Sequence, residues 1–167
     1  MAKLRKQHMT IHWHDIIQAD SNVPAVDATL KEKATLVGRL GLMMLSVGTG
    51  AWRVRNSMNK VSRSLGISCS ADIGLVSIEC TCIGDNETYT QSLSLPTTGV
   101  NTDKLMELEM FMRDFPDLAG EYSVNQFHEV LDHIQKKPAN YKAWNLGLAS
   151  RLPAAHLPFC WAAVRWR

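Results

Sequence analysis

The stretch that decides the fold is residues 29–66, TLKEKATLVGRLGLMMLSVGTGAWRVRNSMNKVSRSLG. Thr29 and Glu32 are spaced as a capping box, in which both side chains bind free backbone N–H groups at a helix start. Leucine, methionine and valine then recur at helical spacing, which predicts a helix with a wide apolar face. Gly38 and Gly41 fall on another face, where their missing side chains would let a neighbouring helix or sheet approach closely.

A glycine corner is expected after this first helix. Gly48 stops it, because glycine adopts left-handed backbone angles without strain, and Thr49 is expected to cap the next helix. That second helix should bury Val54, Met58, Val61 and Leu65.

The other faces of the second helix are basic, with Arg53, Arg55, Lys60 and Arg63. Such a run is compatible with a patch for anions or membrane headgroups. We favour the simpler interpretation of a solvated helix face.

Composition indicates one folded globular domain, since 46% of the 167 residues are hydrophobic and 20% are charged. The net charge of +2 is uneven. Arg151, Arg165 and Arg167 lie in a C-terminal stretch without acids, so the first 150 residues carry 15 basic and 16 acidic side chains. This near-neutral body argues against nucleic acid as the main partner.

The four cysteines, Cys69, Cys80, Cys82 and Cys160, form no CxxC pair. We interpret them as reduced core residues of a cytosolic domain, although Cys80 and Cys82 are also compatible with a metal or redox pair. No cofactor or metal is expected. The basic start MAKLRK is followed by no apolar run, so we expect no signal peptide.

Residues 1–28 are predicted to form a loosely ordered polar arm. The arm holds His8, His12, His14 and Asp15 beside Trp13. A His-x-His pair can bind zinc or copper, but no further ligands follow at a defined spacing.

After Gly66 the apolar period changes to two, which predicts strands over residues 67–73, 76–82 and 87–95. The short turn Gly84-Asp-Asn86 can join only antiparallel neighbours, so the three strands should form a meander with one face on the helices.

Two further helices follow the predicted sheet. The first should begin at Thr102 or Asp103 and end at Phe115-Pro116, and the second should begin at a capping box of Ser123 and Gln126. On these helices we expect Leu105, Leu108, Met112 and Phe115, then Val124, Phe127, Leu131 and Ile134, to be buried.

On the last of these helices, His128 and Asp132 are four residues apart, where we expect an exposed ion pair rather than an acid–base pair. The fold class is α+β, ordered helix–helix, three-stranded antiparallel sheet, helix–helix, with an irregular C-terminal tail. The predicted core includes Leu40, Met44, Val61, Ile78, Leu108 and Leu131.

Residues 143–150, AWNLGLAS, begin like a membrane helix, since Lys136, Lys137 and Lys142 precede them. Arg151 and two later prolines disrupt that pattern. If residues 152–164 are back-translated and read from the third base of the first codon, permitted codons spell ACCAFTFLLGGG, which would continue a membrane helix. We therefore expect that the reading frame was lost near Ser150 and that the natural protein continues into a membrane domain.

The chain resembles the cytoplasmic N-terminal domain of the threonine/serine exporter family over about residues 30–150. The resemblance is carried by GLMMLSVG at 41–48 followed by Arg53-Val54, by Leu65-Gly66 and the Ser-rich strands, and by Tyr141-Lys-Ala-Trp144. The family-motif residues are Gly41, Gly48, Val54, Gly66 and Trp144, and we assign them structural roles.

The resemblance implies an exporter-like domain at 29–142 and the start of a first membrane helix at 143–167, disrupted from Arg151. Family members join such a domain to membrane helices, in one chain or as partner subunits, and export small hydroxy amino acids or, in some relatives, dicarboxylates. Many members carry an acid where this chain has Arg55. The family's soluble domain has been likened to hydrolases, but no GxSxG motif or ordered catalytic triad appears here.

The first functional hypothesis is therefore the soluble N-terminal portion of an exporter, on the cytoplasmic face of the cell membrane and unable to transport alone. The alternatives are a cytosolic small-molecule-binding or hydrolase-like domain, and an interaction module that docks a separate membrane subunit. No catalytic residue is assigned, the substrate-binding residues are not identified, and a homo-oligomer is left open.

Deleting residues 151–167 is expected to leave the melting temperature unchanged or higher. The prolines and arginines of this segment suit neither a spanning nor an amphipathic helix, so we expect it to add no regular element to the core. Thermal unfolding of the full and shortened chains checks this, and a large drop on deletion would contradict it.

Overall fold

The computed structural model describes residues 11, 13–16 and 23–137. Predictions for His8, His12, Trp144, Cys160 and the tail after Ser150 lie outside these residues. The elements, in chain order, are the 3-10 turns η1 (Trp13–Asp15) and η2 (Ala25–Asp27), the helices α2 (Leu30–Ser46) and α3 (Ala51–Ser64), the strands β1 (Ser68–Ile73), β2 (Ser77–Ile83) and β3 (Thr88–Ser94), and the helices α4 (Thr102–Leu118) and α5 (Val124–Lys136). This order confirms the predicted α+β fold.

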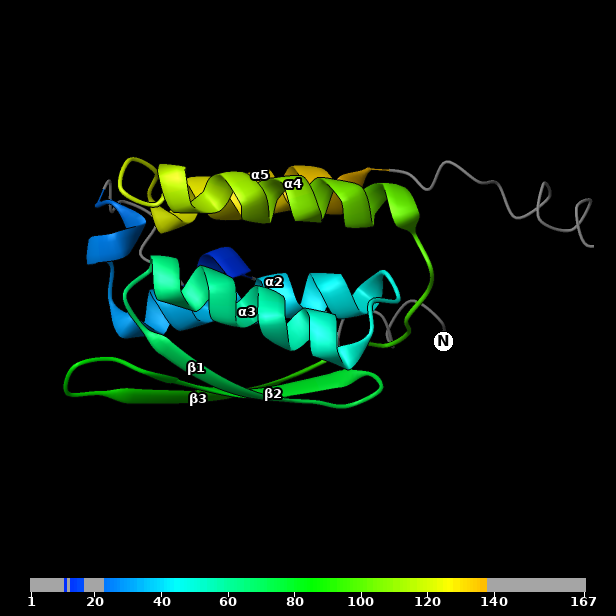
Figure 1. The fold of residues 1–167 in the computed structure, drawn as a ribbon, viewed down its shortest axis with the longest axis horizontal. Helices are drawn as coiled ribbons and strands as arrows, with labels where there is room; N and C mark the ends of the chain where they lie inside the picture. Colours follow the sequence, from blue (N-terminus) through cyan, green and yellow to red (C-terminus); the bar gives the residue numbers. More distant parts are fainter. Residues whose placement is uncertain (1–10, 12, 17–22, 138–167) are drawn as a thin grey trace, which may run out of the picture. The chain divides into compact units, whose positions relative to one another are not determined.

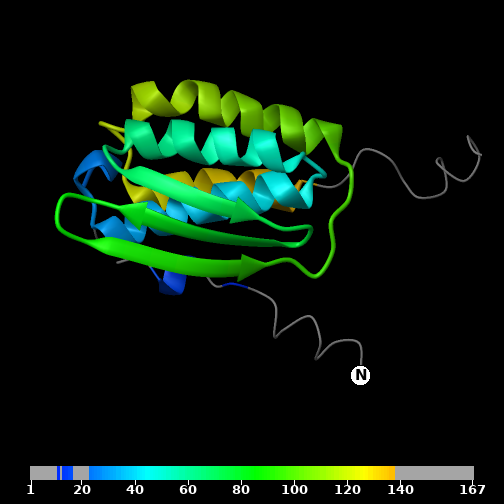
Figure 2. The same ribbon diagram turned by 60° about the horizontal axis from the view of Figure 1, so that its bottom comes forward.

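These elements form three layers (Figures 1 and 2). The sheet is one outer layer, α2 and α3 are the middle layer, and α4 and α5 are the other outer layer. Helix α2 packs on β2 and β3 on one side and on α5 on the other, while α3 packs between β1 and α4. Every residue of α2 from 34 to 45 is consequently buried.

The sheet is an antiparallel meander in the order β1-β2-β3, as predicted. Ile78, Cys80 and Cys82 of β2 are buried and alternate with more exposed side chains, because successive residues of a strand point to opposite faces. One face of the sheet therefore joins the core. The six residues predicted as core are all buried: Leu40, Met44, Val61, Ile78, Leu108 and Leu131.

Both predicted capping boxes are present. The Thr29 hydroxyl accepts from the backbone N–H of Glu32, and the Glu32 side chain accepts from the backbone N–H of Thr29. Ser123 and Gln126 make the same reciprocal pair at the start of α5. These four residues fix where α2 and α5 begin.

The predicted cap of α3 is wrong. Gly50, not Thr49, is the residue that precedes the first turn, and the buried Thr49 hydroxyl has no hydrogen-bond partner among the described residues. Gly48 has a φ of 82°, in the left-handed region, and ends the preceding helix as expected. The chain needs this conformation to turn between α2 and α3, and the turn carries Thr49 past the capping position.

The predicted stop of α4 at Pro116 is also wrong, because the helix continues to Leu118. Proline removes one backbone donor, but the ladder resumes where the N–H of Ala119 donates to the carbonyl of Phe115 at 3.0 Å. Phe115 is fully buried and its ring centroid lies 4.5 Å from that of Phe127 on α5. This packing holds the last turn of α4 in place.

The two helical glycines of α2 permit the close approach of the neighbouring layers. A Cβ at Gly38 would lie 2.3 Å from Nε2 of Gln91 on β3. A Cβ at Gly41 would lie 2.6 Å from Sδ of Met58 on α3 and 3.2 Å from Cδ1 of Ile78 on β2. Side chains of the sheet and of α3 therefore pack directly against the backbone of α2 at these two positions.

Gly41→Ala is expected to lower the free energy of unfolding by about 1–3 kcal/mol, because the added methyl group overpacks a site where Met58 and Ile78 have no exposed surface. Urea unfolding measures the change. Gly120→Ala is the control, since no atom lies within 4 Å of its added Cβ. Equal stability of the Gly41→Ala variant and the wild type would contradict the expectation.

Candidate functional site

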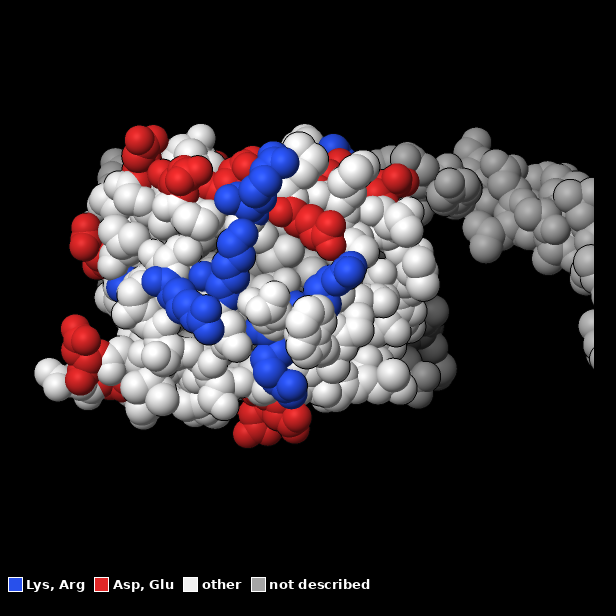
Figure 3. Space-filling model, in the orientation of Figure 1, with Lys and Arg blue, Asp and Glu red and all other residues white. Residues whose placement is uncertain are grey.

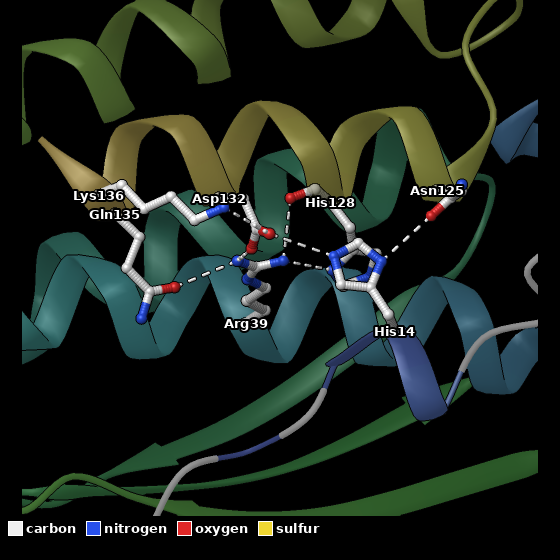
Figure 4. A network of polar contacts seen from close by, with 7 residues as sticks. All are labelled: His14, Arg39, Asn125, His128, Asp132, Gln135 and Lys136. Carbon is white, nitrogen blue, oxygen red and sulfur yellow. Dashed lines mark hydrogen bonds and ion pairs between the residues drawn. The ribbon is translucent and has the colours of Figure 1, made fainter.

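Arg39 is the centre of the polar network between α2 and α5 (Figure 4). Its side chain has no exposed surface, although it lies in the middle of a helix that is otherwise apolar over residues 34–45. A buried guanidinium is strongly destabilising unless its donors are bound and its charge is balanced. The surrounding residues therefore have to supply acceptors.

The acceptors come from one face of α5. Nη1 of Arg39 donates to Nδ1 of His128 at 2.9 Å and to the His128 carbonyl at 3.0 Å. Nη2 donates to Oδ1 of Asp132 and, at 3.2 Å, to Oε1 of Gln135. Positions 128, 132 and 135 lie on one helix face because they are four and three residues apart. Four of the five donors of Arg39 are thereby used, and Nε has no partner among the described residues.

The 3-10 turn η1 closes the network from the other side. The Trp13 ring lies 5.6 Å from Cζ of Arg39, in a cation–π arrangement. His14 places Nε2 at 3.3 Å from Oδ2 of Asp132 and Nδ1 at 3.3 Å from Oδ1 of Asn125. The predicted polar arm thus contributes Trp13, which is 8% exposed, to the core of the domain.

Burial and the nearby Arg39 charge lower the pKa of His128 to about 3, so this imidazole is neutral at physiological pH. Its Nδ1 accepts a hydrogen bond from Arg39, which leaves Nε2 as the protonated nitrogen. Partial burial would raise the pKa of Asp132, but hydrogen bonds from Arg39 and His14 lower it overall. The carboxylate therefore stays ionised opposite Arg39.

The predicted exposed ion pair between His128 and Asp132 is wrong. His128 is fully buried, and both residues bind Arg39 instead of each other. The lone pair of Nδ1 is occupied, so His128 does not serve as a general base in this arrangement. Sequence reasoning did not single out Arg39; its signal is one arginine in the apolar run ATLVGRLGLMML.

A small pocket of about 100 Å³ lies beside Arg39. Its wall is formed by α2, α4, the end of α5, Trp13 and Leu95. The lining residues are Trp13, Arg39, Leu42, Met43, Ser46, Val47, Leu95, Lys104, Leu108, Ile134 and Gln135. None of these described lining residues is acidic.

The cysteine predictions fall on the sheet. Cys80 and Cys82 are buried, Cys69 is half-buried, and all three are free thiols. Hydrogen bonds to Cys69 and Cys80, together with burial, raise the pKa of Cys82. Within residues 11, 13–16 and 23–137, no three potential ligands are placed to bind a metal. Cys80 and Cys82 are core residues.

Basic side chains gather over α3, with acidic side chains on α4 above and on the sheet below (Figure 3). Nη1 of Arg53 lies 3.3 Å from Oε1 of Glu109, and Nε of Arg55 donates to the carbonyl of Ala71 at 3.0 Å. These two side chains therefore bind groups of the protein across the surface of α3.

Comparison with models of known protein families shows to which family the chain belongs. Residues 35–166 match the family model described as "Putative threonine/serine exporter", which covers more than three quarters of the chain. The chain belongs to the threonine/serine exporter family. No curated protein and no solved structure matches it.

The described residues among those predicted as the family motif lie around the middle layer. Gly41 faces Met58 and Ile78, and Val54 is fully buried on α3. Gly48 and Gly66, with φ values of 82° and 70°, end α2 and α3. Trp144 lies outside the described residues. Among the described motif residues, Gly41 lies on the same helix as Arg39.

Among the described residues of this exporter-family chain, none of the helices combines the length and apolar character needed to cross a membrane.

Acidification is expected to destabilise the domain through His128. Its pKa of about 3 in the folded state lies below its ordinary value of 6.5, so the unfolded chain binds more protons between these values. Stability is therefore lost as pH falls from about 6.5 toward 3. Between pH 7 and pH 5 the loss from this group is about 2 kcal/mol.

His128→Asn keeps an acceptor for Arg39 but cannot titrate, so its stability should vary less over this range. The control is His133→Asn, which removes an exposed histidine from the same helix. Urea unfolding at pH 5, 6 and 7 gives the three profiles. Identical pH dependence in the wild type and the His128→Asn variant would show that His128 titrates normally in the folded state.

Proposed function

We propose that this chain is the soluble N-terminal portion of a threonine/serine exporter and that it does not transport alone. The observation that carries the proposal is the exporter-family match over residues 35–166. The intact protein would export small hydroxy amino acids across the cell membrane, and this portion would lie on the cytoplasmic face.

The role proposed for the domain follows from the burial of its most apolar helix inside the domain. Helix α2 is the most apolar of the helices α2 to α5, and its residues 34–45 are covered by β2, β3 and α5. A transport path needs helices that satisfy every backbone polar group through about 30 Å of hydrocarbon. With α2 committed to the core of the domain, we assign that path to a membrane domain or to a partner membrane subunit.

The connection to the membrane is proposed at the end of α5. Residues 29–142 form the exporter-like domain in this proposal, and 143–167 correspond to the start of a first membrane helix, disrupted from Arg151. The basic residues Lys136, Lys137 and Lys142 would hold the domain on the cytoplasmic side by the positive-inside rule. Its task would then be gating, assembly or regulation of the exporter, without catalysis.

Export of labelled threonine from loaded cells tests the proposal. Cells expressing the 167-residue chain should match the empty-vector control, because none of the described helices could form a path through the membrane. A version with the reading frame restored after Ser150 should export threonine or serine above that control.

Two results would contradict the proposal. Efflux from the 167-residue chain above the empty vector would show that it transports alone. A well-expressed restored version that exports no hydroxy amino acid and no dicarboxylate would contradict the assignment to this transport class. Membrane fractionation and an immunoblot establish expression of both versions.

A further inference from the structure

We propose that the pocket beside Arg39 binds a small carboxylate with a short apolar chain. The proposal concerns a ligand site in the soluble domain and is independent of the export proposal, since it is tested by binding to the purified chain. It follows from the charge, the unused donors and the size of the pocket.

Among the described residues, the pocket wall carries two cationic side chains, Arg39 and Lys104, and no acid. Arg39 is shared with Asp132, which binds Nη2 and is itself outside the lining. Lys104 donates to the backbone carbonyl of Gln135 at 2.7 Å, and within the described part of the chain it has no acidic partner. An ammonium group has three donors, so Lys104 can still bind an anion at the pocket mouth.

Arg39, a residue of the same wall, also has a buried donor without a partner among the described residues. Its Nε is buried and has no hydrogen-bond partner in the described structure, whereas its other nitrogens are fully engaged. A buried N–H group without an acceptor is rare in native proteins and calls for an explanation such as a water or ligand. A carboxylate held by Lys104 in this pocket would supply an acceptor to Nε after a small shift of the Arg39 side chain, which has no exposed surface in this structure.

Apart from Ser46 and Gln135, the remaining lining is apolar, and the pocket volume limits the length of the ligand. Leu42, Met43, Val47, Leu108 and Ile134 surround the space. A cavity of about 150 Å³ is enough for benzene, so about 100 Å³ suits a molecule of roughly five non-hydrogen atoms. Propionate has this size. A free amino acid fits less well, because the lining offers no acidic group to its ammonium.

The probe is sodium propionate, titrated at pH 7 into the full 167-residue chain carrying 13C-labelled methionine methyl groups. Met43 lines the pocket, while Met110 is 48% exposed on α4 and does not. Propionate should shift the Met43 resonance in a saturable manner and leave Met110 unchanged. Propionamide, the neutral isostere, should bind at least tenfold more weakly, because it lacks the charge that Arg39 and Lys104 recognise.

Two variants test whether the Lys104 charge binds the carboxylate. Lys104→Gln should raise the Kd for propionate about tenfold. Arg113→Gln is the matched control, since it removes one exposed cation from the same helix and should leave the Kd unchanged. Arg39 is not replaced, because its loss would leave Asp132 and α5 without their partner.

Threonine is titrated as the third ligand and should bind at least tenfold more weakly than propionate. The proposal is overturned if propionate leaves Met43 unshifted, if propionamide binds equally well, or if Lys104→Gln has the wild-type Kd. Threonine binding as tightly as propionate would overturn the choice of a simple carboxylate. None of these results depends on whether a restored protein exports threonine.

Discussion

The burial of α2 on both sides is the constraint on which the rest of the structure depends. A helix between a sheet and a second helical layer must be apolar around its whole circumference, and residues 34–45 fulfil this with Arg39 as the one charged side chain. The glycines at 38 and 41 let the sheet and α3 approach on one side. On the other side, the buried guanidinium packs against the face of α5 that carries His128, Asp132 and Gln135, which accept its hydrogen bonds.

This network favours specificity over stability. Burying an ion pair is often no more stabilising than packing apolar side chains of the same size, but removing one partner leaves a charge unbalanced. A rotation of α5 by one residue would move Asp132 away from Arg39 and leave that charge in the interior. The neutral His128 serves the same end, since its buried ring accepts a hydrogen bond from Arg39 without adding a second positive charge. Trp13 and His14 then cover the network from the N-terminal side.

Local sequence signals predicted the elements well because each rests on neighbouring residues. The capping boxes at Thr29 and Ser123, the change to a period of two after Gly66, and the turn at Gly84 require no knowledge of distant contacts. The error at Thr49 comes from the local turn at Gly48, whereas the errors at Pro116 and the His128–Asp132 pair have tertiary causes. Packing of Phe115 on Phe127 sustains the end of α4, and Arg39, 89 residues before His128, redirects both polar side chains of α5. Patterns within a single sequence carry no information about a contact between residues so far apart in the chain.

The end of α5 is the place where the candidate site would be linked to the role proposed for the domain. Gln135 lies in the last turn of this helix, where its side chain accepts from Arg39 of α2 and its carbonyl accepts from Lys104 of α4. One residue therefore ties the end of α5 to both neighbouring helices, and it also lines the pocket. The chain leaves α5 at Lys136, a few residues before the proposed membrane segment at 143. In the proposed role, the domain would be coupled to the membrane segment through this connection. Gln135 contacts Arg39, lines the pocket and lies in the last turn before the chain leaves α5.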